Sequence, residues 1–429
     1  MPVTPERRGR RAPRALSAFW IGTLALAAGA CGGSSAAPKD GGAGATGAAG
    51  TGGAAGTTGA AGTGGAAGIG GASAGGAGAA GTGGGAGGQA GSNTFGLDQR
   101  PTNTTCLAPA TEADMPAKLS LTGCVDATDP TKPAAGLIPY DVRSPLWSDG
   151  AEKRRWMALP DGGKIHVGAD GDWDFPDGTV LVKSFLLGGQ LVETRLLARL
   201  RGADGGAPAG TWRGFSFLWS ADQTDARLLD GGGTKDYVVG GVTQTWFYPS
   251  RDQCNKCHTA GAGFTLGLET AQLNGDLSYP GGGVANQLAT LDHIGAFDAP
   301  LSGPPSALPA LAVPSGTAPL DARARSYLHA NCSMCHRPGA DSTFGAAIDL
   351  RFSATFKETG LCNVAPAKGD VDVAGALLLV PGDPDKSVVV LRPESTSTTW
   401  RMPPLASSIV HADGTALLRS WITGLTGCP

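Results

Sequence analysis

Cys332-Ser333-Met334-Cys335-His336 is the stretch that decides the fold of the C-terminal part, and Cys254-Asn255-Lys256-Cys257-His258 repeats its pattern. In both stretches two cysteines stand three positions apart and a histidine follows the second one, which is the C-x-x-C-H signature of covalent haem attachment. At this spacing each thiol reaches one vinyl group of a porphyrin, and the adjacent imidazole lies below the iron. A zinc site or a thioredoxin-like pair requires no histidine directly after the second cysteine. The sequence therefore predicts two c-type haems, attached through Cys254, Cys257, Cys332 and Cys335, with His258 and His336 as axial ligands.

A methionine downstream of the second motif completes the expected iron coordination. Met402 precedes Pro403 and Pro404, which cannot enter a helix and restrict the shape of the loop. Helices are expected on either side, over 320–335 and after Asp413. This order of helix, C-x-x-C-H, irregular methionine loop and final helix resembles class I cytochrome c. The resemblance implies an all-α domain over 316–429, with Met402 as distal ligand of the second haem and a raised reduction potential.

The residues ahead of the first motif are predicted to form β-strands. Short β-branched or aromatic runs at 179–182, 215–219 and 245–248 alternate with turn signals such as Pro176-Asp177-Gly178. Regular short strands separated by such turns predict a β-rich domain, a sandwich or a barrel, over 95–250. The residues 251–315 then form a segment that carries the first haem motif.

Three longer stretches resemble a family of bacterial diheme c-type cytochromes, namely 140–156, 248–254 and 327–332. In that family a β-rich region precedes the first haem motif, and a class I cytochrome domain carries the second. The resemblance covers most of residues 100–429. It implies haem binding and electron transfer between redox partner proteins, and it indicates no substrate.

The N-terminus resembles the signal peptide of a bacterial lipoprotein. Five arginines between Arg7 and Arg14 precede an apolar run, 18–30, that is too short to span a bilayer. Cys31 follows directly as the expected lipidation site, although Ala28 stands where the lipoprotein pattern usually has leucine, and an ordinary signal peptide stays open. Residues 1–31 are thus expected to direct export. The lipid on Cys31 would be the only attachment to a membrane, with the protein facing the periplasm or the cell surface.

Residues 32–94 consist almost only of Gly, Ala, Ser and Thr. A chain with so little apolar surface cannot offset the entropy of ordering, so we expect a disordered tether. The net charge of −3 is near balance, which gives no indication of nucleic-acid binding.

Four further cysteines are available for disulfides in the oxidising compartment that export implies: Cys106, Cys124, Cys362 and Cys428. Sequence order favours pairing Cys106 with Cys124 and Cys362 with Cys428, while the two other connectivities stay open. The second pair would tie the methionine loop to the tail behind the last helix.

The sixth ligand of the first haem is open, and the candidates are Met157, His166, His293, His329 and His411. If the first haem has no sixth ligand, an alternative is a diheme enzyme of peroxidase type, in which peroxide binds to that haem. The sequence shows no acid–base residue for that chemistry. A further alternative is a β-rich binding module with the haems as its electron outlet, which fold class alone does not decide. We favour an electron carrier over an enzyme and assign no catalytic residue, because the assigned ligands indicate electron transfer.

Overall fold

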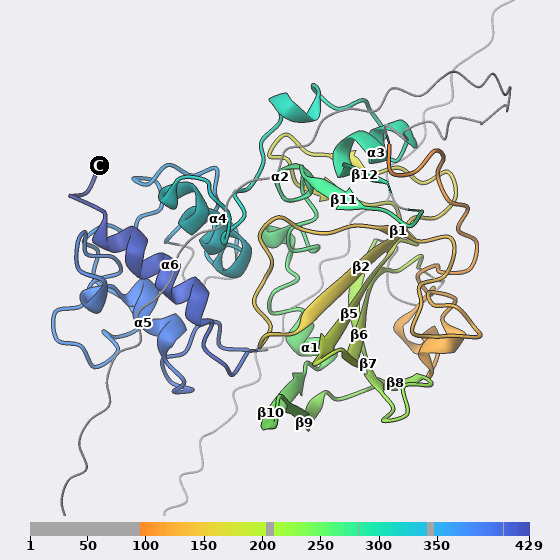
Figure 1. Cartoon of the computed structure of the whole chain (residues 1–429), viewed down its shortest axis with the longest axis horizontal. Helices are drawn as coiled ribbons and strands as arrows, with labels where there is room; N and C mark the ends of the chain where they lie inside the picture. The colour runs from red at the N-terminus through yellow and green to blue at the C-terminus, as the bar shows by residue number, and fades with distance from the viewer. Residues whose placement is uncertain (1–94, 203–209, 282, 341–346, 406) are drawn as a thin grey trace, which may run out of the picture. The chain divides into compact units, whose positions relative to one another are not determined.

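The computed structural model describes residues 95–202, 210–281, 283–340, 347–405 and 407–429 (Figure 1). The expected signal peptide over 1–31, the lipidation site Cys31 and the tether over 32–94 lie outside these residues. The chain divides into Met1–Gly85 and Ala86–Pro429, and all described residues belong to the second unit. None of the helices in this described part is long and apolar enough to cross a membrane.

An antiparallel sheet of six strands forms the centre of the β-rich region (Figure 1). In sheet order the strands are β1 (Ile138–Pro139), β2 (Glu152–Ala158), β5 (Val180–Leu187), β6 (Gln190–Arg199), β7 (Trp212–Trp219) and β8 (Ala226–Leu229). β5 is buried along nearly its whole length, because hydrophobic clusters cover both faces of the sheet. The β-rich fold expected from the sequence is confirmed, and the runs at 179–182 and 215–219 correspond to β5 and β7.

The remaining β-ladders are two-stranded ribbons. They pair β3 (His166–Val167) with β4 (Trp173–Asp174), β9 (Gly233–Val239) with β10 (Val242–Tyr248), and β11 (Asp276–Ser278) with β12 (Val284–Asn286). The strand order of the large sheet begins at β1 and ends at β8, so the sheet is open. The described residues therefore form one large sheet with small ribbons, where the sequence led us to expect a sandwich or a barrel.

Short helices after β10 take the place that a second sheet would fill in a sandwich. α2 (Thr270–Leu273) and α3 (Gln287–His293) contribute Leu273 and Leu288 to a hydrophobic cluster that also contains Ile138 and Met157 from the sheet. The Gln287 side chain fixes α3 further, because its amide oxygen accepts a 2.8 Å hydrogen bond from the backbone N–H of Asp141. The segment 251–315 thus packs into the core of the β-rich region.

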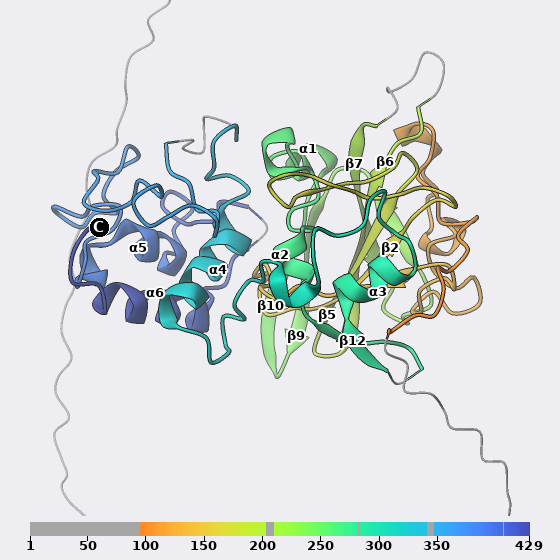
Figure 2. The ribbon, with the colours of Figure 1, turned by 90° about the horizontal axis from the view of Figure 1, so that it is seen from above.

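Residues 316–429 contain α4 (Leu320–Cys332), α5 (Val388–Glu394) and α6 (Ala412–Thr423), joined by long irregular loops (Figure 2). α4 and α6 pack against each other through Leu328, Leu418 and their neighbours. The Trp421 indole of α6 also donates a 2.9 Å hydrogen bond to Asp321 in the first turn of α4. The two helices expected from the sequence are present, and the first of them ends at Cys332, the first cysteine of the motif.

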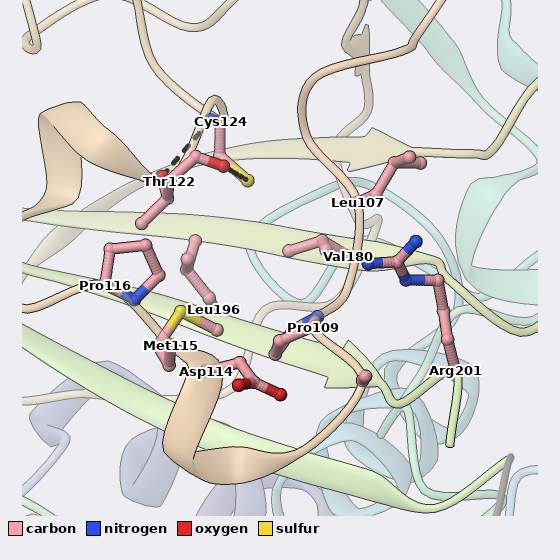
Figure 3. A pocket seen from close by; sticks show the side chains of 11 residues that line it. Leu107, Pro109, Asp114, Met115, Pro116, Thr122, Cys124, Val180, Leu196 and Arg201 are labelled. Atoms are coloured by element: carbon pink, nitrogen blue, oxygen red, sulfur yellow. Dashed lines mark hydrogen bonds between the residues drawn. The ribbon is translucent and has the colours of Figure 1, made fainter. Parts of the chain in front are cut away.

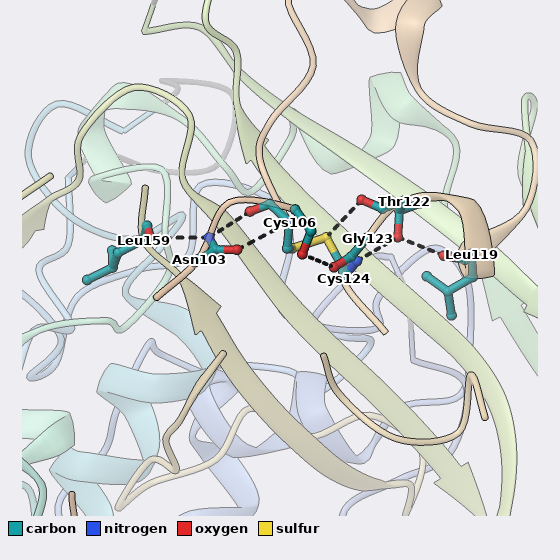
Figure 4. Close-up of a disulfide and its surroundings, with 8 residues drawn as sticks. Asn103, Cys106, Leu119, Thr122, Gly123, Cys124 and Leu159 are labelled. Atoms are coloured by element: carbon teal, nitrogen blue, oxygen red, sulfur yellow. Dashed lines mark hydrogen bonds between the residues drawn. A yellow bond between two sulfur atoms is a disulfide. The ribbon is translucent and has the colours of Figure 1, made fainter. Parts of the chain in front are cut away.

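Disulfides join the pairs that sequence order favours: Cys106–Cys124 and Cys362–Cys428. The first lies in the hydrophobic cluster on one face of the sheet (Figure 4). Its loop is fixed by Asn103, whose side-chain amide donates to the carbonyl oxygens of Cys106 (2.9 Å) and Leu159 (3.1 Å). The second links the loop ahead of Met402 to the residues behind α6, with Cα atoms 5.8 Å apart.

A buried ion pair lies within the sheet. Glu193 on β6 has no exposed surface, and its carboxylate accepts two hydrogen bonds of 2.8 Å from Arg195. The Trp246 indole from β10 donates a third hydrogen bond, 2.9 Å long. Because the carboxylate is fully withdrawn from water, its charge depends on these donors.

Replacing Cys362 and Cys428 together by alanine should lower the free energy of unfolding by up to about 4 kcal/mol. The unfolded chain then regains the freedom that closing a loop of 66 residues removes. Denaturant unfolding of the oxidised protein measures the change. The Cys106→Ala/Cys124→Ala variant, which opens a loop of 18 residues, serves as comparison and should lose up to about 3 kcal/mol. An unfolding midpoint unaffected by the first pair of substitutions would contradict the clamp.

The Glu193→Gln substitution should lower the free energy of unfolding by about 3 kcal/mol, since it leaves the Arg195 guanidinium without its counter-charge. Denaturant unfolding monitored by tryptophan fluorescence measures this loss. Glu152→Gln, at the exposed start of β2, is the matched control and should change stability by less than about 0.5 kcal/mol. Equal effects of the two substitutions would show that the buried pair contributes no more than a surface charge.

Candidate functional site

The second C-x-x-C-H motif lies at the C-terminal end of α4. After Cys332 the chain turns sharply, with the backbone N–H groups of Cys335 (3.1 Å) and His336 (3.0 Å) both donating to the Cys332 carbonyl. The His336 carbonyl in turn accepts a 2.9 Å hydrogen bond from the backbone of Leu350. This turn places the two thiols and the imidazole on one side of the chain. The packing of α4 on α6 holds the whole motif in place.

The first motif has the same local geometry on a shorter helix. α1 (Arg251–Cys254) begins two residues after β10 and is capped by Ser250, which exchanges hydrogen bonds with Gln253 (3.3 and 2.9 Å). The backbone N–H groups of Cys257 (3.2 Å) and His258 (3.0 Å) donate to the Cys254 carbonyl, as in the second motif. Both motifs are therefore helix-end turns of the same form.

Gly214 on β7 makes room for the first motif. A Cβ atom at this position would lie 2.8 Å from the Cys254 sulfur, closer than such atoms approach in proteins. The sequence alone did not single out Gly214, because its role depends on α1 packing across the sheet. An isolated glycine inside a strand pattern is the signal that could have pointed to it, since such a glycine often marks a close approach.

The two motifs meet at one cavity. Its lining is mostly apolar and includes side chains of both motifs, of the methionine loop and of the β-rich region: Leu146, Trp147, Ser148, Arg195, Lys256, Cys257, Leu266, Asn331, Cys332, Met334, Cys335, His336, Met402, Pro403, Pro404 and Leu405. The cavity itself has a volume of about 100 Å³ and opens to solvent. Except for Cys254 and His258, every haem-site residue predicted from the sequence faces this cavity.

A direct contact joins the motifs, because the thiol of Cys257 is hydrogen-bonded to Cys335. This hydrogen bond, together with burial, raises the pKa of Cys257. Burial alone raises the pKa of Cys332 to about 12. The four motif cysteines take no part in the disulfides among the described residues, and their high pKa values keep Cys257 and Cys332 as thiols. These are the groups that thioether formation requires.

The loop behind the first motif orients His258. The imidazole Nδ1 is hydrogen-bonded to the carbonyl of Phe264, which can only accept, so Nδ1 carries the proton and Nε2 keeps its lone pair. Burial, assisted by the charges of Lys183 and Arg195, lowers the pKa of His258 to about 4, which leaves the ring neutral at neutral pH. Phe264 and Leu266 adopt left-handed φ angles of 59° and 55°, which are uncommon for such side chains. A neutral imidazole held at Nδ1 is the form that binds metals through Nε2.

The Met402 loop is held from α5. The backbone N–H of Met402 donates a 3.2 Å hydrogen bond to the carbonyl of Arg392 in α5. The Arg392 guanidinium lies over the ring of Trp400, 5.5 Å from its centroid, and donates to the carbonyl of Lys368 (2.7 Å). These contacts place the thioether of Met402 in the cavity that His336 faces.

Three basic side chains form a row across the sheet beside the first motif. Arg155, Lys183 and Arg195 are register partners on β2, β5 and β6, so their side chains share one face. Arg195 pairs with Glu193, and Arg155 pairs with Asp141. Among the described residues no hydrogen bond or ion pair reaches the Lys183 ammonium, and burial, reinforced by the charges of the two arginines, lowers its pKa well below 10.5. The face beside His258 thus holds two arginines paired with carboxylates and a buried lysine whose charged form is disfavoured.

The five candidates for the remaining axial ligand lie outside the lining of the shared cavity. Met157 is buried in the core of the sheet, and His293 stacks on Phe95. His166 contacts Asp298 (2.8 Å). His329 uses both ring nitrogens, Nε2 at 2.7 Å from Glu269 and Nδ1 at 3.2 Å from the backbone N–H of Phe352. His411 stacks on Trp147 and lines a neighbouring cavity that Met402 also faces.

Another cavity lies between the sheet and the N-terminal loops, at the disulfide (Figure 3). Its lining includes Met115, Cys124, Leu196 and Arg201, and it contains no residue of either motif. Among the described residues, no cluster of His, Cys, Asp and Glu side chains is arranged to hold a bare metal ion. Of these two cavities, only the one that the two motifs share is lined by predicted haem residues.

Compared with family models, curated proteins and solved structures, the chain shows no match. The roles of its residues rest on the sequence patterns and on the geometry described above.

Proposed function

We propose that the protein is a diheme c-type cytochrome that transfers electrons, with one haem attached to each C-x-x-C-H motif. The observation that carries the proposal is the shared cavity, where thiols of both motifs meet and which His336 and Met402 both line. Haem supplies one-electron redox chemistry when bound.

The residues around the second motif fit a six-coordinate haem. Cys332 and Cys335 would form the thioethers, while His336 and Met402 would provide a nitrogen and a sulfur ligand. The order of α4, methionine loop and α6 supports a class I cytochrome arrangement for 316–429. The apolar lining limits access of water, and the thioether favours the ferrous state, so both raise the reduction potential.

The residues around the first motif fit a haem whose proximal ligand is His258. Its Nδ1–H is held by the Phe264 carbonyl, which leaves the Nε2 lone pair for the iron, and Cys254 and Cys257 would form the thioethers. The guanidinium groups of Arg155 and Arg195 lie on the sheet face beside this motif and would be available to the anionic propionates of a bound haem.

Electron transfer is our proposal ahead of the two alternatives, a peroxidase-type enzyme and a binding module. The Cys257–Cys335 contact supports it, since haems attached through adjoining sulfurs would lie close enough to exchange electrons. Apart from the predicted haem residues, the ionisable side chains of the cavity lining are Arg195 and Lys256, and both are cations. A peroxide-cleaving site calls for a proton acceptor instead.

The proposed setting follows from the N-terminal sequence. We propose export, lipidation at Cys31 and a membrane-tethered protein that exchanges electrons with partner proteins in the periplasm or at the cell surface.

The intact mass of the exported protein should exceed that of the processed polypeptide by two haems. Cys254→Ser and Cys332→Ser should each leave a single haem, because each removes one thioether and weakens the attachment of one group. Mass spectrometry of the denatured protein measures this directly, since covalent haem survives unfolding. One haem in the wild-type protein would contradict the assignment of the first motif.

Met402→Ala should lower the reduction potential of one haem and remove the weak ferric absorption that is typical of sulfur-to-iron ligation. The other haem should keep its potential. A spectroelectrochemical titration resolves both quantities. Met334→Ala is a matched control, because Met334 lines the same cavity within the second motif and is assigned no ligand role. An unaltered ferric spectrum in Met402→Ala would show that another residue completes the coordination.

A further inference from the structure

The segment Ser144–Asp149 belongs to the stretch 140–156, which carries the family resemblance. It contains none of the predicted haem residues, so its part in the resemblance has another cause. It lies between β1 and β2 of the sheet. The segment ends in a tight turn, because Asp149 and Gly150 have φ angles of 48° and 76°. β10 supports this turn, since the Gln244 side chain donates a 2.7 Å hydrogen bond to the Asp149 carbonyl.

Asp149 binds the loop that carries Met402. The residue is 4% exposed. Its carboxylate accepts five hydrogen bonds of 2.7–3.0 Å: from the hydroxyl of Ser407, from the hydroxyl and the backbone N–H of Ser408 (the N–H contacting both oxygens), and from the backbone N–H of Ile409. No ion pair to Asp149 is present in the described part of the chain. Its charge is therefore compensated by the dipoles of this one loop.

Trp147 binds the same loop and also α4. Its indole N–H donates 2.9 Å to the carbonyl of Ile409, and its ring stacks on His411 with centroids 4.0 Å apart. Its backbone N–H donates 2.7 Å to the side chain of Asn331, the residue directly before Cys332. Trp147 thus connects the loop behind Met402 to the helix that ends in the second motif.

Ser144 provides a second anchor on α4. Its hydroxyl, fully buried, donates a 2.9 Å hydrogen bond to the carbonyl of Ser326. One short segment of the β-rich region therefore holds both the helix that leads to His336 and the loop that presents Met402.

We propose that Ser144–Asp149 is a positioning segment that sets the distance between Met402 and His336, with Asp149 as its principal residue. The inference rests on the proposed function, because it concerns the ligand set of the second haem. The β-rich region would then help to keep Met402 bound to the second haem. Without Asp149 the N–H groups of Ser408 and Ile409 lose their acceptor, so the loop that carries Met402 detaches more readily.

The test is made on the full-length holoprotein with Asp149→Asn, which keeps the size of the side chain but turns one acceptor into an N–H2 group facing N–H donors. The fraction of ferric protein with Met402 bound is followed by the sulfur-to-iron absorption, while denaturant is added below the unfolding transition. We expect the equilibrium between bound and detached Met402 to shift by about tenfold or more toward detachment. The reduction potential of the second haem should fall, and that of the first should stay.

Glu152→Gln is the matched control, since Glu152 lies just behind the segment at the exposed start of β2 and makes none of these contacts to the loop. This variant should lose the sulfur-to-iron absorption at the same denaturant concentrations as the wild-type protein. If Asp149→Asn does not give folded protein, Ser408→Ala removes one hydroxyl donor from the same carboxylate and should give a smaller shift in the same direction. The combination of Met402→Ala with Asp149→Asn should show the potential of Met402→Ala alone.

The outcomes separate the inference from the proposed function. Wild-type protein without the sulfur-to-iron absorption would contradict Met402 ligation itself. A second outcome would overturn only the role of the segment. In it, the wild-type protein shows the absorption, and Asp149→Asn or Ser408→Ala loses it at the same denaturant concentrations as the wild type.

Discussion

The contact between Cys257 and Cys335 constrains much of the remaining structure. For these side chains to meet, α1 and α4, which are far apart in the chain, must both end at one cavity. α1 reaches it by packing on β7, where Gly214 leaves room for Cys254. α4 reaches it by packing on α6 and by its hydrogen bonds with the segment Ser144–Asp149. The β-rich region is accordingly a structural part of the site, because it provides the surface on which one motif lies and the segment that holds the other.

Electrostatics distinguishes the two sites. The first motif faces three basic side chains on the sheet, of which Arg155 and Arg195 have carboxylate partners and Lys183 lies between them. The second motif and Met402 line a mostly apolar cavity, and the buried carboxylate of Asp149, which binds the loop behind Met402, is satisfied by N–H and O–H groups. In the proposed diheme protein, basic side chains would favour the reduced state of the first haem, and sulfur ligation with exclusion of water would favour that of the second.

The features that could be predicted were those marked by patterns between residues close together in the sequence. The C-x-x-C-H motifs, the helix that ends at Cys332, the strands β5 and β7 and the order of the disulfides follow from patterns a few residues long or from order along the chain. The number of sheets did not follow, because local periodicity does not tell whether strands or short helices such as α2 and α3 cover a face. Gly214, Glu193 and Asp149 were not predictable either. Each acts on residues far away in sequence, and a single sequence gives no signal for such pairs.

The central claim, that two haems attached at adjoining cysteines share one cavity, is tested most directly by electron paramagnetic resonance of the fully oxidised protein. The Cys332→Ser and Cys254→Ser variants provide the spectra of the first and of the second haem alone. Two ferric centres whose porphyrin edges meet interact magnetically, so the account predicts a wild-type spectrum with broadened or split signals that differs from the sum of the two variant spectra. A wild-type spectrum equal to that sum would contradict the account, because it would show two haems too far apart to share the cavity.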